Sequence, residues 1–209
     1  MKKILTLLLS ALMLFSLIGC GNRTSTVSNS SPQQTASTSN DKNTSDASNA
    51  KIAEKGGKKI LIVYFSHTGN TRKAANQIHE LVGGNIIEIK TETPYPTNYN
   101  ECTDLAKREK ESNARPKLST KVENMGSYDV IFVGYPIWWY TAPMAIHTFL
   151  ETYDLSGKTV IPFCTSAGSD VAESMPAIKS LCPNSTVLQG LTANNLNDIK
   201  PWLSKLGML

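Results

Sequence analysis

The stretch that decides the fold is ILIVYFSHTGNTRKAANQI, residues 60–78. Its first six residues are all apolar or aromatic, which is typical of a strand buried on both faces of a parallel sheet. The run stops at six small or polar residues, SHTGNT (66–71), and apolar residues then return with helical spacing. The sequence therefore predicts a buried strand, a polar loop and an amphipathic helix, in that order.

The same alternation of strand and helix continues to the C-terminus. Strands are expected at 59–65, 85–90, 129–136, 159–164 and 185–191, and helices at 69–82, 98–113, 143–153, 171–181 and 195–207. Strands that are apolar on both faces and alternate with amphipathic helices predict an α/β domain with a parallel sheet covered on both sides. Residues 91–120 are too long for a plain connection, and we expect them to fold over one edge of the sheet.

The N-terminus has the layout of an export signal. A short basic start precedes an apolar run from Ile4 to Ile18, which is short for a stable membrane span. The run ends in LIGC, which resembles the bacterial lipobox, where the cysteine is acylated and becomes the new N-terminus. Residues 1–19 are thus expected to be a signal peptide and Cys20 the lipid-carrying residue, at the outer side of the cell membrane. An uncleaved anchor helix is the alternative.

Residues 20–57 are rich in Ser, Thr and Asn and have hardly any apolar side chains. Such a segment buries too little surface to offset the entropy of ordering, so it is expected to be a disordered tether. As a flexible coil it would span about 35 Å between its ends. The folded domain is then expected at 58–209.

Charge and cysteine content restrict the function. From residue 58 onward there are 15 basic and 14 acidic residues, scattered without a basic patch, which argues against nucleic acid as a partner. Cys102, Cys164 and Cys182 are an odd number, without CxxC spacing or a His/Cys cluster, so neither a disulfide framework nor a zinc site is predicted. Isolated thiols are expected, with a single bridge left open.

The loop at 66–71 lies where open parallel sheets bind ligands, beyond the carboxyl ends of the strands. Its hydroxyls, its amide and the N–H groups of the following helix start favour an anion such as a phosphate monoester. It lacks the lysine of a nucleoside-triphosphate loop and the three glycines of a dinucleotide fingerprint. Ser66 and Arg72 have Cys-x5-Arg spacing, but a serine provides no thiolate. A plain helix cap is the alternative interpretation.

Two further loops follow strand ends at the same edge. GYPIWWYTAP (134–143) brings three large aromatic side chains into a loop, which favours a flat conjugated ligand. CTSAGSD (164–170) supplies hydroxyls and backbone donors with little bulk, suited to the polar edge of a ring. The alternatives are that one Trp packs on the helix opening at Pro143 and that the second loop is only a helix cap.

These three loops, in this order, resemble those of the flavodoxin family. SHTGNT is similar to the family's T/S-x-T-G-N-T loop for the phosphate of flavin mononucleotide (FMN), and the other two are similar to the loops that embrace its isoalloxazine ring. The resemblance covers 58–209. It implies an open, doubly wound, five-stranded parallel sheet of order 2-1-3-4-5, with FMN as the cofactor.

The resemblance assigns three groups of binding residues. The phosphate would be held by Ser66, Thr68, Asn70 and Thr71, with backbone contributions from His67 and Gly69. The ring would be lined by Pro136, Ile137, Trp138 and Trp139. Its polar edge would meet Thr165, Ser166, Gly168 and Ser169. Tyr95 or Tyr99 could reach the rim, with surface packing as the alternative for both. Neither a catalytic side chain nor a metal ligand is expected.

The family resemblance implies a noncovalent FMN protein that transfers electrons to a redox partner protein or a small acceptor. An NAD(P)H- or quinol-dependent oxidoreductase that reduces a quinone is the first alternative, and a flavin-free extracellular binding lipoprotein the second. Flavodoxins that act as low-potential carriers are strongly acidic, whereas this domain has a net charge of +1. We therefore expect a less negative reduction potential than that of an acidic relative.

Overall fold

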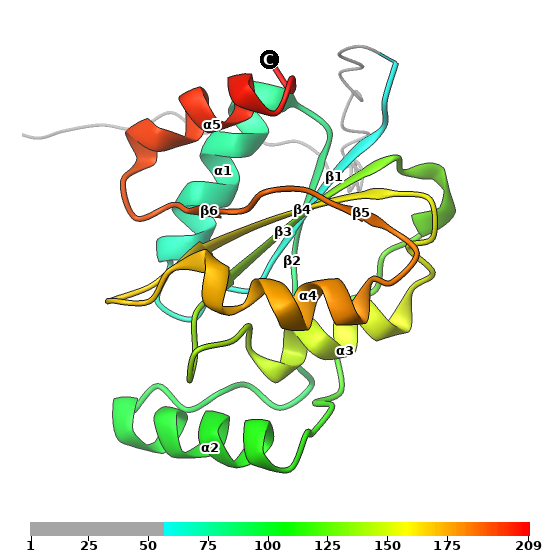
Figure 1. Cartoon of the computed structure of the whole chain (residues 1–209). Helices are drawn as coiled ribbons and strands as arrows, with labels where there is room; N and C mark the ends of the chain where they lie inside the picture. The colour runs from blue at the N-terminus through cyan, green and yellow to red at the C-terminus, as the bar shows by residue number, and fades with distance from the viewer. Residues whose placement is uncertain (1–56) are drawn as a thin grey trace, which may run out of the picture. The chain divides into compact units, whose positions relative to one another are not determined.

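The computed structural model describes residues 57–209 (Figure 1). The predicted signal peptide, Cys20 and nearly all of the predicted tether lie outside these residues. The described chain forms one parallel sheet of order β2-β1-β3-β4-β5, with the short β6 also paired to β4. Its strands are β1 Ile60–Tyr64, β2 Asn85–Glu88, β3 Val130–Pro136, β4 Thr159–Thr165, β5 Thr186–Val187 and β6 Leu191–Thr192. The predicted strand order and α/β class are confirmed.

Helices cover both faces of the sheet. Figure 1 shows α1 and α5 on one side, and α3 and α4 on the other. The α-helices are α1 Asn70–Val82, α2 Tyr99–Glu111, α3 Met144–Thr152, α4 Met175–Leu181 and α5 Ile199–Lys205. Single turns of 3₁₀ helix occur at Met125–Ser127, Val171–Glu173 and Leu196–Asp198.

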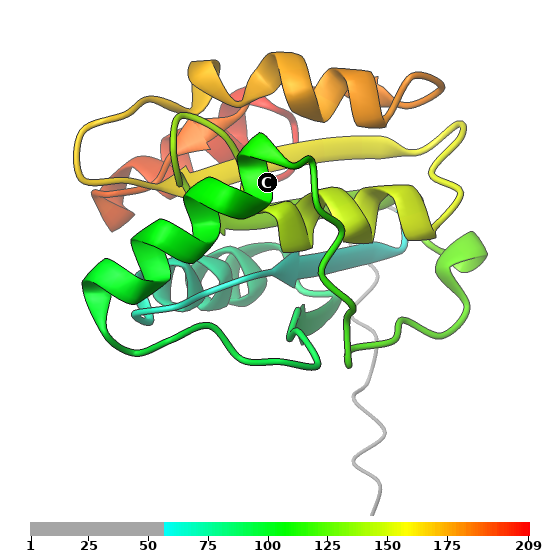
Figure 2. The same cartoon turned by 90° about the horizontal axis from the view of Figure 1, so that it is seen from below.

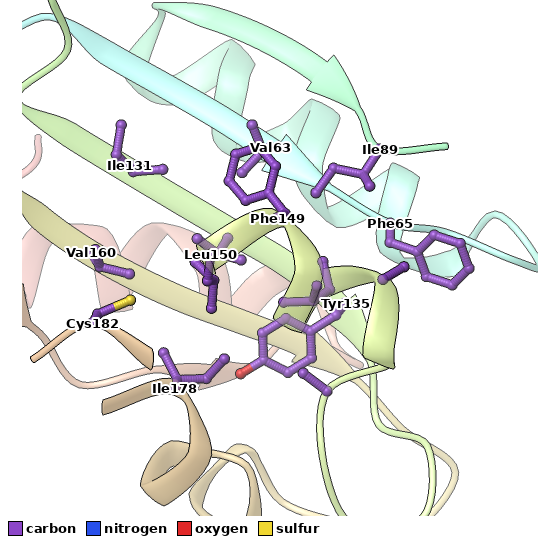
Figure 3. Close-up of a cluster of buried hydrophobic side chains, with 14 of the residues drawn as sticks. Val63, Phe65, Ile89, Ile131, Tyr135, Phe149, Leu150, Val160, Ile178 and Cys182 are labelled. Atoms are coloured by element: carbon purple, nitrogen blue, oxygen red, sulfur yellow. The ribbon is translucent and has the colours of Figure 1, made fainter. Parts of the chain in front are cut away.

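The central strands are apolar throughout because each face of the sheet has its own core. Along β3, Ile131 and Tyr135 point toward α3 and α4, and Phe132 points toward α1 and α5. Figure 3 shows the first of these cores, where Phe149 of α3 and Ile178 of α4 meet the sheet. All five of these side chains are fully buried, as expected for strands without a solvent face.

The fifth predicted strand, 185–191, is instead two short strands with a gap between them. The backbone carbonyls of Val160 and Cys164 in β4 accept hydrogen bonds from the N–H groups of Leu188, just after β5, and Ala193, just after β6. Pro162 lies between them and has no N–H to donate, so the ladder is interrupted there. Gly190 passes close to this point, where an added Cβ would lie 3.0 Å from the Pro162 carbonyl oxygen.

Residues 91–120 were expected to fold over one edge of the sheet, but only part of this segment does so. Its two ends pair beside the edge strand β2, through a bridge between Thr91 and Leu118 and a 2.9 Å hydrogen bond from the Ser119 N–H to the Lys90 carbonyl. Between these ends, α2 packs through Cys102 onto the core on the α3 side. Figures 1 and 2 show α2 on the outside of this layer.

The three cysteines between 57 and 209 are free and buried, as the interpretation of isolated thiols predicts. Burial raises the pKa of Cys164 and of Cys182 to about 11, so both remain protonated at neutral pH. Within the described residues, no group of three His, Cys, Asp or Glu side chains could hold a metal ion. None of the helices in this range is long and apolar enough to cross a membrane.

Candidate functional site

The loop between β1 and α1 is shaped from within by Ser66. Its Oγ accepts hydrogen bonds from the N–H groups of Gly69, at 3.2 Å, and Arg72, at 3.3 Å. Gly69 has a φ of 90°, a conformation that glycine adopts without steric cost. The Ser66 hydroxyl therefore fixes the turn, and its own proton remains available for donation.

Several donors of this loop are unsatisfied by the protein. Among residues 57–209, no group accepts a hydrogen bond from the backbone N–H of His67, Thr68, Asn70 or Thr71. The last two belong to the first turn of α1, where N–H groups have no intrahelical partner. The side chains of Thr68 and Asn70 are exposed and add neutral donors beside them. This donor set suits an anion.

Thr165 connects the three predicted loops. At the end of β4, its hydroxyl lies 2.9 Å from the Thr71 hydroxyl of the first loop. Its carbonyl accepts a 2.9 Å hydrogen bond from the N–H of Ile137 in the second. Thr71 and Thr165 are both buried, so their hydroxyl pair is shielded from water. These two hydrogen bonds of Thr165 hold the loops after β1, β3 and β4 in fixed positions relative to one another.

The loop after β4 is also shaped by a serine. Ser166 Oγ accepts from the N–H groups of Gly168, at 3.2 Å, and Ser169, at 2.8 Å. The Asn194 side chain, just after β6, accepts from the Ser166 N–H at 2.9 Å and donates to its carbonyl at 2.7 Å. Asn194 therefore holds this loop to the end of the neighbouring strand. Asn194 was not among the residues expected to bind FMN, although it follows a predicted strand end.

The aromatic side chains of the second loop serve different purposes. Trp138 is half-buried and packs edge-on against Phe65, His67 and Tyr95, with ring centroids 5.0–5.8 Å apart. Its main neighbours thus lie at the end of β1 and in segment 91–98, not on the helix that begins after Pro143. Tyr95 is buried beneath it and is not at the rim.

Residues 138–141 form a tight hairpin. Trp138 and Thr141 exchange both backbone hydrogen bonds, at 2.9 and 3.1 Å. Trp139 and Tyr140 at its tip have φ values of 50° and 66°. Positive φ at both central positions defines a type I′ turn, which strongly favours Asn and Gly and is strained for bulky side chains.

Two adjoining cavities open at this edge of the sheet. The phosphate-side cavity, of about 690 Å³, includes Thr68, Asn70 and Thr165, and the α2-side cavity, of about 670 Å³, includes Trp139 and Ser169. They share the walls Thr68, Tyr99, Pro136, Ile137, Trp138, Ser166 and Ala167. Eleven of the fourteen predicted binding residues line one or both cavities; the others are Ser66, Gly69 and Thr71.

The comparisons with known proteins agree with this arrangement. The flavodoxin family model matches residues 59–206, which is well over half of the chain. This chain belongs to the flavodoxin family.

Solved structures of related proteins support the assignment. A candidate flavoprotein from Bacteroides eggerthii is 38% identical, with a TM-score of 0.67, over 72% of this chain and 98% of the other. A candidate flavoprotein from Bacteroides uniformis is 33% identical, with a TM-score of 0.65, over 70% and 98%. A flavoprotein from Lactobacillus acidophilus, solved in complex with FMN, shares the fold at 24% identity and a TM-score of 0.61, over 69% and 98%. No match was found among curated proteins.

This flavodoxin domain has cavity residues that the three loops alone did not reveal. On the α2 side they are Thr97, Tyr99, Cys102, Thr103 and Ala106. Of these, only Tyr99 was expected near the ligand from the sequence, and it is 80% exposed. The others depend on how the long segment 91–120 folds back over the site, which no local pattern specifies.

The charges in this flavodoxin cleft are few. Lys73 lines the phosphate-side cavity and Glu173 the α2-side cavity. Arg72 is engaged with Glu88 and does not line either cavity. Burial raises the pKa of the Glu109 carboxyl, which accepts a 2.7 Å hydrogen bond from the Tyr95 hydroxyl behind the cleft. The walls are thus mainly neutral, with one cation on the phosphate side.

Proposed function

We propose that this flavodoxin-family protein binds FMN noncovalently in the cleft and transfers electrons through it. The observation that carries the proposal is the group of four unsatisfied N–H donors at His67, Thr68, Asn70 and Thr71, beside an aromatic wall. Together they offer one end of the cleft to a phosphate and the other to a planar ring. FMN is also the cofactor in the Lactobacillus acidophilus structure.

The residues present fit this cofactor. Backbone N–H groups and the side chains of Thr68 and Asn70 match the oxygens of a phosphate monoester. Lys73, near the same end, provides the single positive charge. Ile137 and Trp138 offer apolar contact to the ring, and the loop at Ser166 offers backbone donors to its polar edge. When bound, FMN supplies one- and two-electron redox chemistry, whereas the protein orients it and limits its exposure to water.

The location of this activity is part of the proposal. The export signal and the LIGC sequence support lipidation at Cys20 and attachment to the outer side of the cell membrane. A tether at 20–57 would keep the domain close to the bilayer without embedding it. The proposed redox partner is then a protein or small acceptor on that side of the membrane.

Titration of the full chain with FMN and with riboflavin, followed by flavin fluorescence, tests the binding mode. We expect FMN to bind at least about tenfold more tightly, because riboflavin has no phosphate for the charge-assisted hydrogen bonds. Thr68→Val should weaken FMN about tenfold and leave riboflavin unchanged. Thr148→Val is the matched control, because Thr148 donates to Met144 within α3. Equal affinity for both ligands would contradict the phosphate site, and the absence of any flavin binding would favour a flavin-free binding protein.

An NAD(P)H- or quinol-dependent oxidoreductase is the second candidate function. The observation in its favour is the α2-side cavity, which extends past the residues assigned to FMN toward Thr103 and Ala106. Steady-state oxidation of NADH, NADPH or a quinol with an artificial acceptor separates the two candidates. Turnover by the FMN-loaded chain would support the enzyme, and no turnover would support the carrier.

A further inference from the structure

We propose that Glu109 of α2 is a positioning residue for the flavin ring: it fixes Tyr95, and Tyr95 in turn orients Trp138 in the wall of the cleft. This inference rests on the proposed function, because the effect is on the ring of the bound FMN. Neither Glu109 nor Tyr95 lines either cavity, so both residues act on the ring through Trp138.

Glu109 lies on the inner face of α2, where an apolar side chain is expected. Cys102 and Ala106 precede it at helical spacing, and both are buried. Glu109 continues this face and is half-buried, whereas its neighbours Arg108 and Lys110 are exposed. Among residues 57–209, no cationic side chain forms an ion pair with Glu109. A leucine would hold the helix in place without the cost of burying a carboxylate, so the docking of α2 alone does not explain this residue.

The Glu109 carboxylate accepts a hydrogen bond from a single buried hydroxyl. Tyr95 Oη donates to Glu109 Oε2 at 2.7 Å. Burial and, after it, the hydrogen bond to Glu109 raise the pKa of Tyr95 above its ordinary value of 10, so the hydroxyl keeps its proton and remains the donor. Hydrogen bonds to charged acceptors are stronger than those between neutral groups, so this contact holds the Tyr95 ring in one position.

Trp138 depends on contacts with other rings for its orientation. The indole N–H groups of Trp139 and Trp202 donate hydrogen bonds to backbone carbonyls, at 3.0 and 3.1 Å. Within 57–209, the Trp138 indole has no such hydrogen bond and meets Tyr95 edge-on, with ring centroids 5.0 Å apart. Phe65 lies 5.4 Å from each of these two rings. Because Trp138 lines both cavities, the orientation of its ring sets the shape of the wall offered to the flavin.

Titration of the full chain with FMN and with riboflavin, followed by flavin fluorescence, tests this inference. Tyr95→Phe keeps the ring and removes the hydroxyl, whereas Glu109→Gln keeps the size of the side chain and removes its charge. Each variant should weaken both ligands by the same factor, about threefold to tenfold, because the effect is on the ring and not on the phosphate. A loss confined to FMN would place the effect at the phosphate and overturn the proposal.

Glu111→Gln is the matched control. It removes the same charge from an exposed position of the same helix, two residues further along. It should change either affinity less than about twofold, because exposed charges contribute little. Equal effects of Glu109→Gln and Glu111→Gln would show that only the net charge matters, which overturns the proposal.

Two double variants show whether Glu109 acts through the rings. Glu109→Gln should weaken flavin binding no further when Tyr95→Phe or Trp138→Phe is already present. The visible absorption bands of bound riboflavin should also shift in Glu109→Gln and not in Glu111→Gln, which a purely structural role for Glu109 does not predict. Additive losses of affinity, or bands identical to those of the parent chain, would overturn the proposal.

Urea unfolding of the FMN-free chain separates this inference from the proposed function. Nonadditive effects of Tyr95→Phe and Glu109→Gln would support a pair that forms without a flavin, and strictly additive effects would overturn it. A chain that binds FMN with an affinity unchanged by either variant overturns the positioning role and leaves FMN binding intact. A parent chain that binds no flavin removes the proposed function, and this inference with it, even where the two residues are coupled in unfolding.

Discussion

At the residue scale, Thr165 is the side chain on which the geometry of the cleft depends most. Its hydroxyl and carbonyl reach two different loops, whereas the hydroxyls of Ser66 and Ser166 each shape only their own loop. The buried hydrogen bond between the Thr165 and Thr71 hydroxyls thus connects two loops. An unpaired buried hydroxyl is costly, so the two residues should be energetically coupled.

We expect Thr71→Val to lower the free energy of unfolding by about 1–3 kcal/mol, because it leaves the Thr165 hydroxyl buried without its partner. Urea unfolding of the single variants and of Thr71→Val/Thr165→Val measures the coupling. The double variant should be less destabilised than the sum of the two single variants. Strictly additive effects would show that the two hydroxyls do not interact in solution.

At the element scale, the loops at the carboxyl edge are held by contacts that the sequence pattern did not reveal. The clearest case is Asn194, whose amide pairs with both backbone groups of Ser166. These two hydrogen bonds replace a pair of backbone hydrogen bonds beyond the strand ends, and they link the end of β6 to the loop after β4.

Asn194→Ala should weaken the binding of FMN and of riboflavin equally, by about tenfold, because it removes two hydrogen bonds that order the ring-side loop. Asn197→Ala is the control, since only the backbone N–H of Asn197 takes part in a hydrogen bond, to Asn195. Flavin fluorescence titrations measure both variants. A loss confined to FMN would instead place Asn194 at the phosphate.

Helix α3 should make the domain sensitive to acid. The pKa of His147 lies below its ordinary value of 6.5, mainly because the side chain is buried and secondly because Arg115 lies nearby. Glu151 has the opposite, smaller effect. As pH falls below about 6.5, the unfolded chain binds this proton before the folded chain does, so stability falls. The hydrogen bond from Arg115 lowers the pKa of the Glu151 carboxyl below its ordinary 4.5, so its stabilisation is lost only at lower pH.

His147→Gln should therefore lose less stability than the parent between pH 7 and pH 5, measured by urea unfolding at each pH. The window lies above the titration of Glu151, so the difference reports on the histidine. An identical loss in both proteins would show that His147 takes up its proton equally in the folded and unfolded states.

Helices and strands could be predicted from the sequence more accurately than the contacts between them. The apolar runs and the SHTGNT corner placed β1, α1 and the three loops correctly, because buried strands and helix starts have strong local signals. The gap between β5 and β6 arises from Pro162 in the neighbouring strand. The α2-side cavity arises from segment 91–120 folding back to meet the hairpin at Trp139. Both depend on residues distant in sequence, which a local pattern cannot reveal.

At the scale of the whole molecule, charge should set the redox behaviour. The domain has a net charge of +1. The residues that line the cleft include one lysine, Lys73, and one carboxylate, Glu173. Negative charges around a bound flavin oppose its reduction. In this domain they are balanced by positive charges. Potentiometric titration of the FMN-loaded chain should give a less negative potential than that of a strongly acidic flavodoxin. An equally low potential would show that local contacts, not net charge, determine it.

The proposed attachment to the membrane depends on a single residue. Cys20→Ala should leave the protein without acyl chains and shift it from the membrane fraction to the soluble fraction on expression in bacteria. Incorporation of labelled palmitate and cell fractionation are the measurements. Retention of the variant in the membrane would support the uncleaved anchor helix instead.

The visible absorption spectrum of the purified full chain, after incubation with FMN and desalting, is the decisive test of FMN binding in the cleft. We expect retained absorption bands of an oxidised flavin, in about equal molar amount to the protein, and their loss from a variant in which Thr68 and Thr71 are replaced by Trp. A colourless protein that also leaves the fluorescence of added FMN unquenched would contradict it.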